Sequence, residues 1–266
     1  MSLEISGLQV RFGARPVVNI DRLGLGDAEI LGLAGESGSG KSMTALAVLG
    51  LAWSAGADVS GSIALDGLEL VGMPERELRQ IRGRRIAAIF QSPAAAFNPV
   101  FRVGRIVADA LARHGLAGSE AADRVASAMR QLLLSPDLLR RYPAQLSGGQ
   151  LQRVAIALAV ALRAQVLLAD EPTSALDVTV QAEVLELLRE LRARDGMSVL
   201  FISHDLAVIA ELCDRVAVMR SGEVVEQGLT GQVITAPRHD YTRELLAAVP
   251  RLSGGDDPPL GLGSDP

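Results

Sequence analysis

The stretch GESGSGKS at residues 35–42 constrains the fold of this chain more than any other feature. It fits the pattern G-x-x-x-x-G-K-[ST] and lies between an apolar run, AEILGLAG (28–35), and a helical pattern that begins at Lys41. Glycines let successive backbone N–H groups turn toward phosphate oxygens, and the helix N-terminus adds positive potential. The order strand, loop, helix therefore predicts a phosphate-binding loop in an α/β fold.

Lys41 is the only lysine among the 26 basic Lys and Arg residues. A compact ammonium group reaches the β- and γ-phosphates from inside such a loop, whereas the planar fork of arginine fits the enclosed space poorly. Ser42 supplies the hydroxyl that ligates Mg²⁺ in loops of this kind. We expect the triphosphate to be held by Gly35, Glu36, Ser37, Gly38, Ser39, Gly40, Lys41 and Ser42.

Two adjacent carboxylates follow a second apolar run. VLLAD (166–170) ends in Asp170, and Glu171 comes next. At the carboxyl end of a parallel strand beside a phosphate loop, Asp170 can hold Mg²⁺ and Glu171 can position or deprotonate an attacking water. Taken alone, a strand that ends in Asp-Glu is more often a surface turn, so this assignment depends on the loop upstream.

Strand and helix patterns alternate along most of the chain, which is typical of an α/β fold with a largely parallel sheet. Residues 103–134 break this alternation and predict two amphipathic helices, so we expect a helical insertion over about 92–160. The last residues, 251–266, are rich in Gly, Pro and Asp and predict a mobile tail. Expected strands cover 3–12, 28–35, 61–67, 86–90, 166–170, 197–203, 215–220 and 223–228, and a long helix covers 178–194.

Composition excludes several classes of protein. The net charge of −5 and the pI near 5.3 argue against nucleic-acid binding, which needs basic surface. A single cysteine, Cys213, excludes an internal disulfide or a cysteine-rich metal site. The longest apolar run, VAIALAVAL (154–162), is far shorter than the roughly 20 residues that cross a bilayer. The N-terminus does not have the build of a signal peptide, so a cytosolic protein is expected, with any membrane segment supplied by another chain.

The sequence LSGGQ (146–150) narrows the class. Ser147, Gly148 and Gly149 open a helical run and form a second anion-binding terminus, although in isolation the pattern is a plain serine N-cap. With the phosphate loop and the carboxylates in this order, the chain resembles the ATP-binding-cassette (ABC) family over about residues 3–235. The resemblance implies a RecA-like parallel core, an antiparallel β subdomain and an inserted helical subdomain. Residues 236–250 then form a C-terminal helix.

The resemblance also implies roles for further residues. The signature, including Gln150, would contact the γ-phosphate bound by a second subunit, so that two ATP molecules are enclosed in a head-to-tail dimer. Gln91 matches the glutamine that senses Mg²⁺ and water, and His204 in FISHD matches the histidine that contacts the γ-phosphate. SALD (174–177), ending in Asp177, matches the loop that crosses the dimer interface. Phe12 matches the aromatic residue that stacks on adenine, although a lone Phe that ends a strand is more often a core residue.

Three stretches resemble a narrower group, the nickel/dipeptide/oligopeptide importers. They are LRQIRGRRIAAIFQSPAAAFNPV (78–100), YPAQLSGGQLQR (142–153) and RHDYTRELLAAVP (238–250). Asp240 stands where the last of these usually has proline. The cysteine-containing C-terminal extension of the peptide members is absent, which is compatible with a shorter nickel-type or accessory subunit.

These features predict an ATPase subunit that works at the cytoplasmic face of the membrane. Its expected partners are a second ABC ATPase subunit, two membrane permeases and an extracytoplasmic solute-binding protein. A non-transport ABC accessory subunit of a soluble complex, of the carbon–phosphorus lyase type, remains an alternative. A regulatory module with an inactive site is disfavoured, because Lys41, Ser147, Asp170, Glu171 and His204 are all present. The transported molecule and the choice between a homodimer and a heterodimer stay open.

Overall fold

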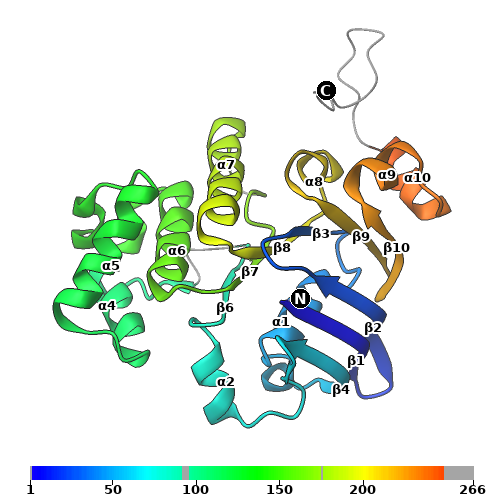
Figure 1. Cartoon of the computed structure of the whole chain (residues 1–266), viewed down its shortest axis with the longest axis horizontal. Helices are drawn as coiled ribbons and strands as arrows, with labels where there is room; N and C mark the ends of the chain where they lie inside the picture. Colours follow the sequence, from blue (N-terminus) through cyan, green and yellow to red (C-terminus); the bar gives the residue numbers. More distant parts are fainter. Residues whose placement is uncertain (1, 92–95, 175, 249–266) are drawn as a thin grey trace, which may run out of the picture.

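The computed structural model describes residues 2–91, 96–174 and 176–248. Two sheets and a group of helices make up this part of the chain (Figure 1). The strands are β1 (Leu3–Phe12), β2 (Arg15–Leu25), β3 (Ile30–Ala34), β4 (Asp58–Leu65), β5 (Leu68–Glu69), β6 (Ile86–Ile89), β7 (Val166–Asp170), β8 (Ser198–Ser203), β9 (Arg215–Arg220) and β10 (Glu223–Leu229). The α-helices are α1 (Lys41–Val48), α2 (Glu75–Ile81), α4 (Val103–Arg113), α5 (Gly118–Gln131), α6 (Gly148–Leu162), α7 (Val178–Asp195), α8 (Leu206–Leu212), α9 (Thr230–Thr235) and α10 (Asp240–Ala247).

The larger sheet has the order β10-β9-β3-β8-β7-β6, and all its neighbouring strands are parallel except the β9–β10 pair. The middle residues of its central strands are apolar, because both faces of the sheet are covered. In β8, Val199 and Phe201 face the core shared with the helices. Leu200 and Ile202 face a second core shared with α1 and the smaller sheet. The predicted parallel α/β core is confirmed.

The smaller sheet is antiparallel, with the order β2-β1-β4-β5. We did not expect β2, although Val18 and Ile20 are fully buried in an alternating pattern. Its signal is weakened by Pro16 at the start and by the charged pair Asp21 and Arg22 in the middle. The strand forms because β1 supplies a complete antiparallel partner and the core beneath it takes the alternate side chains.

Helices α4, α5 and α6 gather on one side of the larger sheet (Figure 1). The two amphipathic helices expected within 103–134 are α4 and α5, joined at His114–Ala117. They bury apolar faces, represented by Val107 and Met129, against α6 and the larger sheet. None of the helices in the described ranges is long and apolar enough to cross a membrane.

The C-terminal part differs from the expected single helix over 236–250. A short helix, α9, precedes it, and α10 begins only at Asp240, because Pro237 interrupts the chain and His239 caps the helix by accepting the N–H of Tyr241. The tail expected over 251–266 lies outside the described residues.

Candidate active site

Four groups of predicted site residues lie at the ends of neighbouring strands of the parallel sheet. The phosphate loop follows β3, His204 follows β8, Asp170 ends β7, and Gln91 comes shortly after β6. Parallel pairing places the carboxyl ends of these strands at one edge of the sheet. The fold therefore brings together groups that are up to 169 residues apart, from Gly35 to His204.

The loop 35–42 packs closely on the strands around it, and two of its glycines are required for that reason. A Cβ atom on Gly35 would lie 2.2 Å from the carbonyl oxygen of Met219, and one on Gly40 would lie 2.8 Å from that of Val17. Gly40 also has φ of 107°, which favours glycine. The Gly222 N–H donates to the Ser39 carbonyl at 2.8 Å and so joins the loop to the β9–β10 turn.

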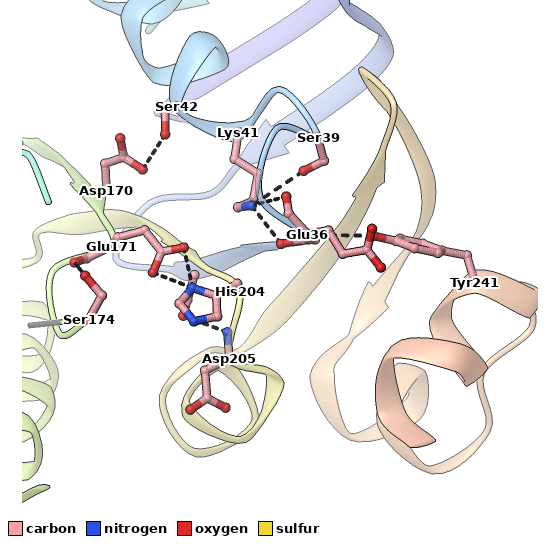
Figure 2. A network of polar contacts seen from close by, with 12 residues as sticks. Glu36, Ser39, Lys41, Ser42, Asp170, Glu171, Ser174, His204, Asp205 and Tyr241 are labelled. Atoms are coloured by element: carbon pink, nitrogen blue, oxygen red, sulfur yellow. Dashed lines mark hydrogen bonds and ion pairs between the residues drawn. The ribbon is translucent and has the colours of Figure 1, made fainter. Parts of the chain in front are cut away.

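Lys41 lies folded inside its own loop. It is 5% exposed, and its Nζ donates to the carbonyl oxygens of Gly35 at 2.7 Å and Glu36 at 2.8 Å (Figure 2). Burial lowers the pKa of the amine, and the charges of Glu171, Asp170 and Glu36 partly oppose that shift. The two carbonyl oxygens thus hold the ammonium group inside the loop. Oxygens of a bound phosphate would compete with these carbonyls for the ammonium protons.

Ser42 and Asp170 form the second contact of the site. The Ser42 hydroxyl donates to Asp170 Oδ1 at 3.0 Å (Figure 2). Burial raises the pKa of the Asp170 carboxyl, the Ser42 hydrogen bond and Lys41 lower it, and the charge of Glu171 raises it further. A hydroxyl and a carboxylate oxygen at this spacing are the donor set that suits Mg²⁺, so the residues present fit the ion.

Glu171 has an unusual backbone and a specific partner. Its φ is +50°, in the left-handed region, and its N–H donates to the Ile202 carbonyl at 2.9 Å. Both carboxylate oxygens lie 2.8 Å from Nδ1 of His204. Because an ionised carboxylate only accepts hydrogen bonds, Nδ1 carries the proton in this pair. The contact joins two residues that we singled out separately.

Gln91 and Phe12 occupy different surroundings. Gln91 is exposed beyond the end of β6, at the same edge of the sheet as Asp170. Phe12 ends β1 and is partly buried, and it packs against the core beneath the smaller sheet. This packing agrees with the alternative that we attached to Phe12, a core residue, and leaves its role toward adenine as a prediction.

The signature opens helix α6 with a reciprocal capping box. The Ser147 hydroxyl accepts the Gln150 N–H at 3.2 Å, and the Gln150 side-chain oxygen accepts the Ser147 N–H at 3.1 Å. Gly149 is buried, and a Cβ atom there would lie 2.6 Å from Cγ1 of Val180, in the first turn of α7. Asp177 caps that same helix by accepting the Val180 N–H at 3.0 Å. The signature and the first turn of α7, which Asp177 caps, therefore pack together within one chain.

A groove of about 310 Å³ lies beside the signature. Its lining includes Ser147, Gln150 and Val180, together with the exposed Leu133. Among the described residues, no hydrogen bond joins the signature to the loop 35–42. Within one chain, the signature and the phosphate loop, both predicted to bind anions, belong to different parts of the fold.

Comparison with known proteins decides the family. The sequence matches the ABC transporter family over residues 18–174, which is more than half of the chain. This chain belongs to the ABC transporter family. The predicted ABC ATPase fold, with its parallel core and antiparallel sheet, is confirmed by the solved cassettes that it resembles.

The relatives of this ABC chain include named import proteins. It is 44% identical over 272 residues to the peptidoglycan transport ATP-binding protein YejF of Agrobacterium fabrum, with 99% of this chain and 49% of that protein covered. It is 45% identical over 258 residues to a putative peptide import ATP-binding protein of Brucella abortus, with 94% and 77% covered. It is 45% identical over 264 residues to the glutathione import ATP-binding protein GsiA of Salmonella choleraesuis, with 94% and 42% covered. The chain thus spans about half the length of the first and third of these relatives.

Two solved cassettes have the same fold. The dimeric ATP-binding cassette MJ0796, in a post-hydrolysis state with ADP and Pi, gives a TM-score of 0.74 at 27% identity, with 86% of this chain and 98% of that one covered. CbiO1 of Clostridium perfringens gives 0.77 at 24% identity, with 93% and 95% covered. The narrower resemblance to peptide importers agrees with the names of the relatives above.

Sequence reasoning missed one contact of the phosphate loop. The hydroxyl of Tyr241, on α10, accepts the backbone N–H of Glu36 at 3.2 Å (Figure 2). We singled out the run RHDYTRELLAAVP only for its resemblance to importers. Its tyrosine was the available signal, but nothing local to the sequence indicates which loop the side chain reaches.

Proposed function

We propose that this chain binds and hydrolyses MgATP and drives a membrane importer of the peptide and nickel class. The observation that carries the proposal is the assembly of Lys41, Ser42, Asp170, Glu171 and His204 at one edge of the sheet. This edge of the sheet therefore provides a cation that can bind phosphate, oxygen ligands for Mg²⁺ and a carboxylate base that contacts a histidine.

Each group has a distinct role in this proposal. Lys41 and the loop N–H groups bind the β- and γ-phosphates, and Ser42 and Asp170 hold Mg²⁺, which neutralises charge on the phosphates when bound. Glu171 accepts a proton from the attacking water, and His204 orients the Glu171 carboxylate and meets the γ-phosphate. Gln91 is proposed to sense the metal and the water, and Phe12 is proposed to stack on adenine.

We further propose that hydrolysis requires a second ABC subunit, arranged head to tail. The signature, Ser147–Gln150, has no hydrogen bond to the phosphate loop of its own chain among the described residues, and Ser147 is exposed. MJ0796, which is 27% identical, forms a dimer in its ADP-bound structure. Asp177 would then act at the interface, next to the signature on which its helix packs.

Membrane permeases and an extracytoplasmic solute-binding protein complete the proposed system, and the chain works on the cytoplasmic face of the membrane. The names of the relatives, which mention peptide, glutathione and peptidoglycan transport, support an importer of small peptide-like solutes. The cargo itself is selected by the other components.

Purification of the tagged full chain in mild detergent tests the proposal. Two multispanning membrane proteins should accompany it, and their presence should raise its Mg²⁺-dependent ATPase rate. Recovery in a detergent-independent complex with carbon–phosphorus lyase activity would contradict transport while leaving ATP hydrolysis intact. A complex with the permeases that hydrolyses no ATP would contradict the enzymatic part.

A further inference from the structure

One peptide group of the phosphate loop is held from both of its sides. Its carbonyl, on Gly35, accepts the Lys41 ammonium group at 2.7 Å. Its N–H, on Glu36, donates to the Tyr241 hydroxyl at 3.2 Å. One peptide group, Gly35–Glu36, therefore makes both hydrogen bonds, one to Lys41 and one to Tyr241 (Figure 2).

The ring of Tyr241 is held by packing contacts, in addition to the hydrogen bond that its hydroxyl makes to the loop. It is 3% exposed and belongs to the core shared by α8, α9 and the larger sheet. The guanidinium of Arg220, at the end of β9, lies 4.7 Å from the centre of its ring. The hydroxyl therefore comes from a rigid side chain and not from a mobile surface residue.

The start of α10, the helix that carries Tyr241, is hydrogen-bonded to the hairpin formed by β9 and β10. Glu226, on β10, accepts the N–H groups of Arg238 at 2.7 Å and His239 at 3.0 Å, immediately before α10 begins. The turn of the same hairpin holds the loop directly, because Gly222 donates to Ser39. The β9–β10 hairpin and α10 thus each make one hydrogen bond to the phosphate loop, at Ser39 and at Glu36.

We propose that Tyr241 is a positioning residue for the phosphate loop, through which the docking of α10 sets the affinity for nucleotide. This rests on the proposed function and adds to it a residue outside the phosphate loop, the carboxylate pair and the signature. The hydrogen bond from Glu36 N–H to Tyr241 fixes the orientation of the Gly35–Glu36 peptide, and with it the backbone of the loop to which the proposed function assigns phosphate binding. Loss of the hydroxyl removes a part-buried hydrogen bond and leaves the Glu36 N–H without this partner, so that the peptide can rotate.

The variant Tyr241→Phe tests this role, because it removes the hydroxyl and keeps the packed ring. In the full chain, the Kd for MgADP should rise about three- to tenfold, as expected for one hydrogen bond. The KM for MgATP should rise by a similar factor, while kcat changes less than about twofold. Tyr142→Phe is the matched control, since Tyr142 is the only other tyrosine and is exposed, and it should bind as the wild type does.

Amide hydrogen exchange tests the contact without nucleotide. In ¹⁵N-labelled protein, the Glu36 amide should exchange faster in Tyr241→Phe than in the wild type and in Tyr142→Phe. Glu226→Ala, which removes the hydrogen bonds at the start of α10, should also raise the Kd for MgADP. Combined with Tyr241→Phe, it should weaken binding less than the product of the two single effects, because both changes break one connection.

Three results would overturn the proposal. Wild-type Kd and Glu36 exchange in Tyr241→Phe would show that the hydroxyl does not position the loop. A lower Tm with an unchanged Kd would reduce Tyr241 to a packing residue. Failure of the wild-type chain to bind MgADP or MgATP would overturn the proposed function itself, and this inference with it.

Discussion

Nδ1 of His204 lies 2.8 Å from both carboxylate oxygens of Glu171, on side chains that follow two adjacent parallel strands. The His204 side chain is 60% exposed and that of Glu171 is 12% exposed, so the pair presents its imidazole to solvent and keeps its carboxylate inside. With the proton on Nδ1 donated to Glu171, Nε2 is the ring nitrogen left for a ligand, and it would donate to a phosphate oxygen only when it also carries a proton. In the proposed function, this arrangement would let His204 orient the base and meet the γ-phosphate at the same time.

Replacing His204 should slow hydrolysis much more than it weakens binding. We expect His204→Ala to lower kcat about a hundredfold, since Glu171 loses the partner that orients it, with the Kd for MgATP changed less than about threefold. His114→Ala is the matched control, because His114 lies at the end of α4, outside the site. A His204→Ala variant with the wild-type kcat would show that the contact is incidental.

Removing the Ser42 hydroxyl should raise the Mg²⁺ requirement. The hydroxyl contacts Asp170 and is one of the two proposed protein ligands, so Ser42→Ala should need about tenfold more Mg²⁺ for half-maximal ATPase activity. Ser119→Ala, at an exposed position in α5, should keep the wild-type requirement. An unchanged Mg²⁺ titration in Ser42→Ala would place the metal elsewhere.

The buried carboxyl of Asp170 predicts a pH-dependent stability. Its pKa is raised, chiefly by burial, so the proton is held more tightly in the folded chain than in the unfolded one. Its contribution to the free energy of unfolding is complete below the unfolded pKa and is lost as the pH rises through the folded pKa. Without Mg²⁺ or nucleotide, Asp170→Asn should therefore have a higher Tm than the wild type at neutral pH, and the difference should shrink as the pH falls.

Thermal unfolding from pH 4 to pH 8 measures this effect. The exposed Asp123→Asn serves as the control, and its Tm should follow that of the wild type across the range. A Tm advantage of Asp170→Asn that grew toward low pH would have the opposite pH dependence to the prediction. Burial of Asp170 would then not explain its effect on stability. The same variant should lose Mg²⁺-dependent hydrolysis, so stability and activity move in opposite directions at this position.

The signature variant Ser147→Arg should separate binding from turnover. Arginine at this exposed position would obstruct an approaching subunit, whereas the phosphate loop of the same chain is untouched. We expect MgATP binding within about threefold of the wild type and ATPase activity reduced at least about a hundredfold. Ser119→Arg places the same side chain on α5 and should remain active. Full activity in Ser147→Arg would contradict the head-to-tail dimer.

The sequence predicted the parallel core well, because strands covered on both faces contain continuous apolar runs that are easily recognised. The run VLLAD was expected as a strand over 166–170 and forms β7 with those bounds. The helix that begins at Lys41 ends at Val48, because Gly50 (φ 63°) follows in a left-handed conformation that an α-helix does not accommodate. In β2, tertiary pairing with β1 decided the structure against a weak local pattern.

Motif spacing predicted the site residues, but not the contacts between them. The placement of Lys41 and Asp170 at one edge follows from strand order, which sequence patterns indicated. The bond between Glu36 and Tyr241 joins residues 205 positions apart and depends on how α10 docks. The requirement for glycine at 149 likewise comes from the approach of Val180 in another helix, and no local signal reports such packing.

Phosphate release by wild-type and Glu171→Gln protein, at saturating MgATP and with bound nucleotide measured in the same samples, tests the central claim most directly. The account predicts equal occupancy, within about threefold in Kd, and turnover at least about a hundredfold slower in Glu171→Gln, because the amide cannot accept the proton of the attacking water. Turnover at the wild-type rate in Glu171→Gln would contradict it.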